Sequence, residues 1–185
     1  MAIREIKLTM GNSIVDYGIT WSYPNSDGKT YELPIYRLTV EGADNAGNKA
    51  TKSFDVYRFG VHRPSEKATA RVVGLSSEQT HKIKAWIPTY RVHSAPSTED
   101  GAWQVYGNFL IHDGPDDPQT ESYASIGCIE ICRGPNGFVQ FNDFIVSLSG
   151  SVKPSRGEKL VEIGSSGKMV ITYLKAARPP LKEKT

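Results

Sequence analysis

One histidine and one cysteine stand at the two ends of a single polar loop, within the segment LIHDGPDDPQTESYASIGCIEIC. An apolar, strand-like run leads into His112, and the chain later turns at Ser125, Ile126 and Gly127 into Cys128. A thiol becomes a strong nucleophile when a neighbouring base takes its proton. If the flanking strands pair, both side chains face one cleft, so the segment predicts a cysteine nucleophile with a histidine base.

The residues around Cys128 suit this chemistry. Gly127 precedes it and allows a sharp backbone turn, because glycine has no Cβ. We expect the Gly127 and Cys128 N–H groups to point at a developing oxyanion, where one donor is typically worth about 3 kcal/mol of barrier. His112 precedes Cys128 in the chain, which argues against papain-like sites, where the cysteine comes first. In the alternative interpretation Cys128 is a small buried residue and His112 bonds a backbone carbonyl.

The segments Ile111-His112-Asp113-Gly114 and Ser125-Ile126-Gly127-Cys128-Ile129 together resemble the signature of the L,D-transpeptidase catalytic domain family (YkuD-like). That family carries a His, a loop of similar length, then Ser/Thr-x-Gly-Cys and an aliphatic residue. The resemblance covers roughly residues 70–175 and is specific only across 111–129.

The resemblance implies an enzyme that acts on peptidoglycan stem peptides. Cys128 would attack the carbonyl of the L-centre of a diamino acid and expel the terminal D-Ala. His112 would be the general base and then the acid, with the backbone carbonyl of Asp113 as the third member. The acyl group would pass to an amine (transpeptidase) or to water (L,D-carboxypeptidase). The chemistry needs no metal and no organic cofactor.

Several positions depart from the family pattern. Ile126 stands where many members have His or Lys, and Glu130 stands where many have Arg. Asp113 stands where many have Gly. Arg133 is the candidate to replace the missing Arg in substrate binding. The upstream Thr-Pro-x-Gly segment is also missing. The resemblance is therefore to a divergent member, such as the antibacterial effector branches.

Three further residues are candidates for substrate binding. Ser125 either bonds the loop or the histidine, or simply caps the turn. Strand alternation puts Tyr106 on the same face as His112, although a sheet-surface or core aromatic is the more ordinary interpretation. His93 ends a predicted strand and is expected on the rim of the cleft or on the surface.

The alternation of apolar and polar residues predicts a mainly β fold. The resemblance implies an L,D-transpeptidase-like β-sandwich or barrel with one helix after the catalytic Cys. That helix is predicted at residues 137–148, where Phe138, Phe141, Ile145 and Leu148 share a face and Gly150 follows as a stop. The expected strands are 3–9, 13–21, 30–40, 52–59, 70–73, 82–92, 103–112, 127–131, 159–163 and 168–175.

The length of 185 residues suits one domain with a sizeable core. We expect a β-rich N-terminal part at 1–60, packed on a catalytic domain at 61–176, and a flexible tail at 177–185. The net charge of +2 and the lack of a basic cluster argue against a nucleic-acid partner. No apolar run is long enough to span a membrane.

The N-terminal residues lack the continuous apolar core of a secretory signal. The chain is therefore expected to be made in the cytoplasm or to be a mature form from which a signal was removed. Since peptidoglycan lies outside the cytoplasm, we expect a protein made in the cytoplasm and delivered by a specialised secretion system to the periplasm of a target cell. An immunity protein that plugs the cleft would then be a partner. Two other functions stay open: a non-catalytic β-rich module of a phage tail or secretion apparatus, and a cysteine amidase that cuts within the stem peptide.

Overall fold

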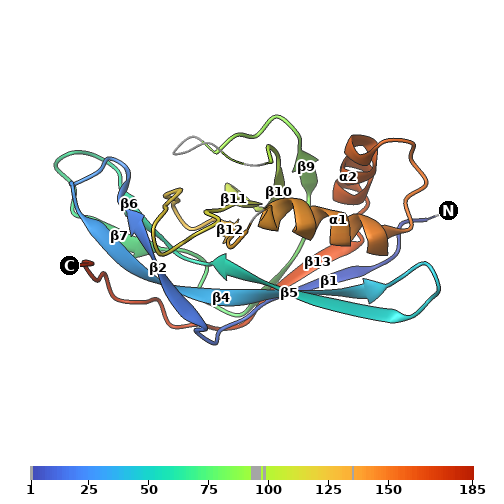
Figure 1. Cartoon of the computed structure of the whole chain (residues 1–185), viewed down its shortest axis with the longest axis horizontal. Coiled ribbons are helices and arrows are strands. Elements are labelled where there is room, and N and C mark those ends of the chain that lie inside the picture. The colour runs from blue at the N-terminus through green and yellow to red at the C-terminus, as the bar shows by residue number, and fades with distance from the viewer. Residues whose placement is uncertain (1, 93–96, 98, 135) are drawn as a thin grey trace.

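Two β-sheets and two helices make up the computed structural model, which describes residues 2–92, 97, 99–134 and 136–185. The larger sheet curls, and both helices lie together on one side of its long strands (Figure 1). Its strand order is β8-β13-β1-β4-β5-β12-β11-β10-β9, with β2 also paired to β4. The smaller sheet has the order β3-β6-β7. The mainly β prediction is confirmed.

The elements have the following bounds. The strands before the His–Cys loop are β1 (Ile6–Met10), β2 (Asp16–Trp21), β3 (Tyr23–Pro24), β4 (Thr30–Ala43), β5 (Lys49–Tyr57), β6 (Gly60–Arg63), β7 (Arg71–Val73), β8 (Gln79–Lys82), β9 (Ala85–Ile87), β10 (Ala102–Tyr106) and β11 (Phe109–Asp113). The elements after it are β12 (Ile129–Ile131), α1 (Gly137–Ser149), α2 (Arg156–Ser165) and β13 (Met169–Tyr173).

The long strand β4 joins the parts of the large sheet. Its residues 30–35 pair with β2, and its residues 38–42 pair with β1. β5 runs antiparallel to β4 and then pairs with β12, which brings in the His–Cys segment. The strands of residues 1–60 therefore occupy the middle of this sheet, and the expected division at residue 60 is not seen in the described parts of the chain.

Helix α1 matches the prediction at 137–148. Its buried face contains Phe138, Phe141, Ile145 and Leu148, and Gly150 ends it with φ of 72°. A left-handed residue after the last turn favours glycine. The four apolar side chains belong to the same buried core as the strands, so α1 covers the sheet beside the His–Cys segment.

Helix α2 was not predicted, and the strand expected at 159–163 is wrong. Ser155 accepts a hydrogen bond from the Glu158 N–H at 3.2 Å, and the Glu158 side chain accepts one from the Ser155 N–H. This capping box starts a helix, and Leu160 and Ile163 are buried at helical spacing. The fold thus has two helices rather than one in the described residues.

Two expected strands are each split. The run 103–112 forms the antiparallel hairpin of β10 and β11, which turns at Gly107 and Asn108. Gly107 has φ of 53°, a conformation that glycine adopts without a steric penalty. The run 82–92 yields the end of β8 and the short strand β9. Strands β3 and β6 were missed.

The C-terminal tail, expected to be flexible, pairs with the start of β4 in the structure. The Glu32 N–H donates to the Lys182 carbonyl at 2.8 Å, and the Lys184 N–H donates to the Thr30 carbonyl at 2.7 Å. Lys182 also contacts the Glu32 carboxylate at 2.9 Å. The tail therefore extends the sheet edge at this end of the molecule.

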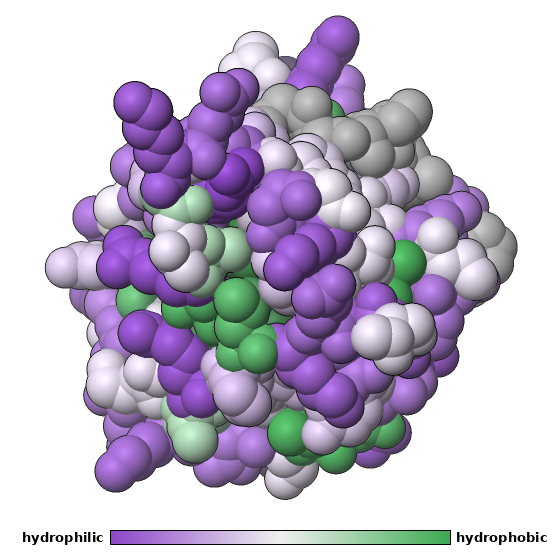
Figure 2. Space-filling model, turned by 90° about the vertical axis from the view of Figure 1, so that its left-hand side faces the viewer, coloured by the Kyte–Doolittle hydropathy of each residue, from purple (hydrophilic) through white to green (hydrophobic). Residues whose placement is uncertain are grey.

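The end of the molecule on the left of Figure 1 has a mainly polar surface with small apolar patches (Figure 2). The large apolar side chains that are clearly exposed in the described residues include Ile14, Tyr17, Ile126 and Leu181. None of the helices in the described part of the chain is long and apolar enough to cross a membrane.

Candidate active site

His112 and Cys128 lie on neighbouring parallel segments. β11 and β12 pair in parallel, with Ile111 opposite Ile129 and His112 opposite Glu130. Paired residues of parallel strands point to the same face, and residues two apart on one strand do so as well. Ile111 and Ile129 enter the core, whereas His112 and Cys128 line one cavity of about 320 Å³.

The ring of His112 is held in one orientation. Its Nδ1 lies 2.7 Å from the carbonyl oxygen of Asp113, and the ring packs on Tyr90 with centroids 5.3 Å apart. A carbonyl oxygen only accepts hydrogen bonds, so Nδ1 is assigned as the N–H donor. In the neutral imidazole this leaves Nε2 with a lone pair that can accept a proton.

Cys128 is a protonated thiol at neutral pH. Burial raises the pKa of Cys128 to about 11, against a smaller opposing effect of the Leu110 N–H, which hydrogen-bonds the sulfur. Sγ lies 3.7 Å from the Asn108 carbonyl oxygen, to which the thiol donates. Because the thiolate is the nucleophile, attack by Cys128 requires a base that removes the proton.

The turn before Cys128 is fixed by close backbone packing. Gly127 has φ of 104°, and a Cβ there would lie 2.9 Å from the Cα of Gly74. A Cβ on Gly60 would lie 2.0 Å from the Ser125 carbonyl oxygen. Only glycine fits at these approaches, so Gly60 and Gly74, which the sequence did not mark, shape the turn together with Gly127.

The oxyanion role expected for Gly127 does not match the structure. The Gly127 N–H donates to Oγ of Ser125 at 3.3 Å. A substrate oxygen would have to replace the serine oxygen before this N–H could stabilise it. Ser125 itself is buried and lines the cavity. Its Oγ accepts the Gly127 N–H and so caps the turn, which is one of its two predicted roles.

The cavity wall is apolar and aromatic, with a few neutral polar groups. No Asp, Glu, Lys or Arg belongs to the wall that the described residues form. Asn108 and Tyr90 were missed as wall residues, although the Gly-Asn pair at 107–108 is a turn signal. The wall consists of Tyr23, Ile87, Tyr90, Val92, Gln104, Gly107, Asn108, Leu110, His112, Ala124, Ser125, Ile126 and Cys128.

Two predicted substrate-binding residues lie elsewhere. Tyr106 is half exposed and stacks on His81, with ring centroids 4.8 Å apart. It is not part of the cavity wall, because the hairpin turn at Gly107 interrupts the alternation that was expected to align it with His112. His93 falls outside the described residues.

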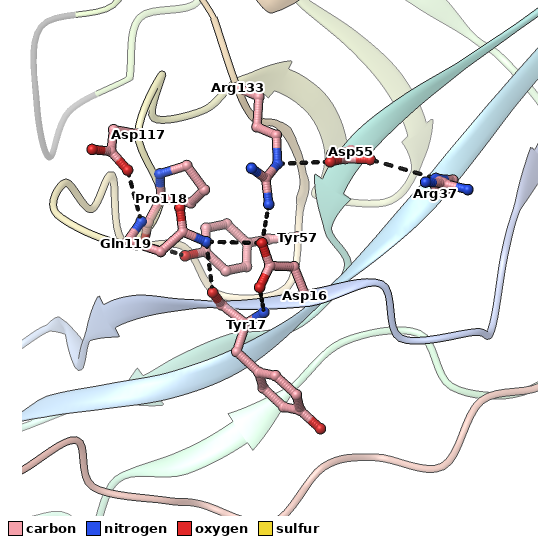
Figure 3. Close-up of polar contacts among 9 residues, drawn as sticks. All are labelled: Asp16, Tyr17, Arg37, Asp55, Tyr57, Asp117, Pro118, Gln119 and Arg133. Carbon is pink, nitrogen blue, oxygen red and sulfur yellow. Dashed lines mark hydrogen bonds and ion pairs between the residues drawn. The ribbon is translucent and has the colours of Figure 1, made fainter.

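Arg133 does not line the cavity either. Its guanidinium lies between the carboxylates of Asp16 and Asp55, with Nε 2.7 Å from Asp55 (Figure 3). Asp55 also faces Arg37 at 3.7 Å. Arg133 has φ of 68°, and this backbone turn directs it to β2 and β5. It therefore cannot replace the family Arg in the cavity.

The same network anchors the loop between His112 and Cys128 (Figure 3). The Pro118 carbonyl accepts hydrogen bonds from the Ile19 N–H at 2.8 Å and the Tyr57 hydroxyl at 3.2 Å. The Gln119 amide donates to the Tyr17 carbonyl at 2.8 Å. The loop is therefore attached to β2 at its middle, away from the cavity.

A buried carboxyl group lies beside the cavity. Glu130 is 3% exposed, and one of its carboxyl oxygens has no hydrogen-bond partner among the described residues. Burial raises the pKa of Glu130 to about 8, opposed by a hydrogen bond with Ser125 and increased by the nearby charge of Asp113. The residue was noted in the sequence only as a replacement for the family Arg.

A larger open hollow of about 690 Å³ lies along β1, β4 and β13. Its charged side chains are lysines and glutamates, and no cysteine or histidine lines it among the described residues. The part of the chain that the structure describes contains no cluster of three or more His, Cys, Asp or Glu placed to hold a metal ion. The smaller cavity, in contrast, is lined by both Cys128 and His112.

Comparisons with protein-family models, with curated proteins and with solved structures found no match. What can be concluded about the site thus comes from its own geometry: a thiol and an oriented imidazole share one cavity.

Proposed function

We propose that this chain is a cysteine acyl-transfer enzyme of L,D-transpeptidase type that acts on peptidoglycan stem peptides. The observation that carries the proposal is that His112 and Cys128 line one cavity, with His112 Nδ1 engaged by the Asp113 carbonyl. The motif resemblance supplies the substrate class and the L,D-transpeptidase-like fold. It also supplies the expected reaction, as transpeptidase or L,D-carboxypeptidase.

In the proposed reaction, His112 Nε2 takes the Cys128 proton as the sulfur attacks the carbonyl carbon of the bond to the terminal D-Ala. The C–N bond then breaks, and the protonated histidine gives its proton to the leaving amine. This leaves a thioester on Cys128. Water or an acceptor amine, deprotonated by His112, attacks the thioester and restores the thiol.

The protonation state of the Cys128 thiol determines when His112 takes its proton in this scheme. Since burial keeps Cys128 protonated at neutral pH, a stable thiolate–imidazolium pair is not the expected resting state. The proton instead moves during the attack. Removal of His112 should therefore lower the rate of acylation more than it lowers binding of the stem peptide.

The test is incubation with purified tetrapeptide muropeptides, followed by mass analysis of protein and products. The parent chain should release or exchange D-Ala, and Cys128→Ala should not. Cys132→Ala is the matched control, because Cys132 is also buried but does not line the cavity. Product masses separate loss of D-Ala from a cut within the stem peptide, the amidase alternative. Turnover by Cys128→Ala would refute the proposal.

A second candidate function is a non-catalytic binding or structural module of a phage tail or secretion apparatus. The burial of Cys128 and its raised pKa favour this candidate. Mild alkylation near neutral pH distinguishes the two. A merely structural thiol stays unmodified with and without muropeptide. An acyl-transfer thiol is alkylated when muropeptide is absent, and is protected or acylated when it is present.

We further propose that the activity is that of an antibacterial effector delivered to the periplasm of a target cell, with an immunity protein that covers the cavity. Expression behind an added export signal should then stop growth or alter cell shape, whereas cytoplasmic expression should not. Exported Cys128→Ala is the control. Equal toxicity of the parent and Cys128→Ala chains would contradict this role.

A further inference from the structure

Glu130 lies beside the proposed nucleophile and base in the sheet. It is the register partner of His112 across β11 and β12 and follows Cys128 by two residues. Its side chain shares their face of the sheet but does not reach the cavity wall. It is therefore placed to act on the site through its neighbours and not on a substrate.

Glu130 contacts both ends of the loop that separates His112 from Cys128. At the far end its carboxyl interacts with the Ser125 side chain, which lowers the Glu130 pKa, and Oγ of Ser125 accepts the Gly127 N–H at 3.3 Å. At the near end it packs against Gly114, where an added Cβ would lie 2.9 Å from the Glu130 Cβ. A chain of contacts thus runs from its carboxyl through Ser125 to the residue before Cys128.

We propose that Glu130 is a positioning residue of this site: its buried carboxyl group holds the turn that presents Cys128, and a negative charge on this carboxyl opposes formation of the Cys128 thiolate. The inference rests on the proposed function for its catalytic meaning. Its physical content, the effect of Glu130 on the thiol, does not require that a stem peptide is the substrate.

The surroundings of Glu130 explain the direction of the effect. Except for His112, the neighbouring titratable groups become negative when they ionise, so a charged carboxylate is disfavoured in this buried place. An ionised Glu130 in turn raises the pKa of Cys128. The groups are His112 and Asp113 from β11, Cys128 and Cys132 from the two ends of β12, Tyr57 from β5, and Tyr90 and Tyr123 from the loops.

The test is the rate of iodoacetamide alkylation at Cys128, mapped by peptide mass spectrometry across a pH series. Glu130→Gln keeps the shape and removes the charge, so the Cys128 titration should move to lower pH. If the thiol titrates one pH unit lower, alkylation should be on the order of tenfold faster above pH 8, where Glu130 is ionised. Glu121→Gln, an exposed carboxyl in the same loop, is the matched control and should change nothing.

Ser125→Ala provides a second, independent variant in case Glu130→Gln folds poorly. Because the Ser125 side chain lowers the Glu130 pKa, its loss should raise that pKa. The effect of ionised Glu130 on the Cys128 thiolate should then begin at a higher pH. Identical Cys128 titrations in the parent, Glu130→Gln and Ser125→Ala chains would overturn the inference.

D-Ala release, measured in parallel, separates the two proposals. If no chain releases D-Ala but Glu130→Gln changes the thiol titration, the proposed function fails and the role of Glu130 stands. If the parent releases D-Ala and Glu130→Gln leaves both the titration and the pH profile of turnover unchanged, the role of Glu130 fails and the function stands.

Discussion

His112 is oriented by its own neighbour in the chain: its Nδ1 donates to the carbonyl oxygen of Asp113 at 2.7 Å. A backbone carbonyl cannot be removed by substitution and cannot titrate. The tautomer of the imidazole is therefore fixed without a third side chain. In a Ser-His-Asp triad, by contrast, the orienting group is a carboxylate, and its loss costs orders of magnitude in rate.

The first prediction follows from this bond. Asp113→Asn keeps the backbone carbonyl, so turnover should stay within about tenfold of the parent, whereas loss of a triad carboxylate costs about four orders of magnitude. The measurement is D-Ala release under saturating muropeptide. His112→Asn is the comparison that should abolish it. A loss in Asp113→Asn as large as that in His112→Asn would assign the role to the carboxylate.

The second prediction concerns the backbone around the cysteine turn. In Gly60→Ala the new Cβ would lie 2.0 Å from the Ser125 carbonyl oxygen, so the turn must move. Overpacking of this kind costs about 1–3 kcal/mol of unfolding free energy, or more. Urea denaturation would measure the loss, and alkylation of Cys128 would report the displaced turn.

Gly157→Ala is the matched control for that substitution. Gly157 lies in α2, and a Cβ there meets nothing within 4 Å. Because Gly157 lies in the first turn of α2, alanine there should leave the stability unchanged or raise it by at most about 0.5–1 kcal/mol, the value for a helix interior. If Gly60→Ala behaved like Gly157→Ala, the close approach at Ser125 would not constrain the turn.

The third prediction concerns the pH dependence of stability. Glu130 has a folded pKa of about 8, raised from 4.5, so the folded state keeps a proton that the unfolded state has released. The contribution of this proton to the unfolding free energy is complete below pH 4.5 and is lost as the pH rises to about 8. Between these two pH values, the titration of Glu130 lowers the unfolding free energy by up to about 1.4 kcal/mol per pH unit.

Glu130→Gln removes this dependence. Denaturation across the pH series should therefore show Glu130→Gln and the parent diverging steadily above pH 4.5, with the variant the more stable near pH 8. The exposed control Glu121→Gln should follow the parent. Parallel curves for the parent and Glu130→Gln would mean that Glu130 ionises at its ordinary pKa in the folded protein.

The fourth prediction concerns Arg58, which is fully buried. Its guanidinium donates to the carbonyls of Leu75 at 3.0 Å, Gly11 at 2.9 Å and Leu174 at 2.6 Å. Arg58→Met leaves three carbonyls without this donor, which should cost at least about 3 kcal/mol of unfolding free energy. Urea denaturation would measure it, with the exposed Arg71→Met as control. Equal midpoints for the two variants would contradict the structural role of Arg58.

Local patterns were a good guide to some elements and a poor guide to others. The helix at 137–148 was predicted because four apolar residues recur at helical spacing and a glycine ends them. Helix α2 was missed because residues 159–163 form a short run rich in apolar and β-branched residues, and such a run does not distinguish a strand from a helix. The capping box of Ser155 and Glu158 was the signal that separates the two interpretations.

The errors at the candidate site have a common cause. Tyr106 was placed beside His112 on the assumption of one continuous strand, but the turn at Gly107 folds it away. Arg133 was the candidate to replace the family Arg if the local turn brought it to the cavity, but its positive φ directs it toward Asp16 and Asp55. A single turn residue in each case reverses where a nearby side chain points.

The sequence by itself determined the mainly β character, the helix after the cysteine and the His–loop–Cys spacing, because these depend on local periodicity and on residue types. Only the tertiary structure decided that β11 and β12 pair in parallel, that Glu130 is buried opposite His112, and that Gly60 and Gly74 approach the cysteine turn. The physical reason is that strand pairing and burial arise from contacts between distant segments, and the pattern within one segment does not specify its neighbours.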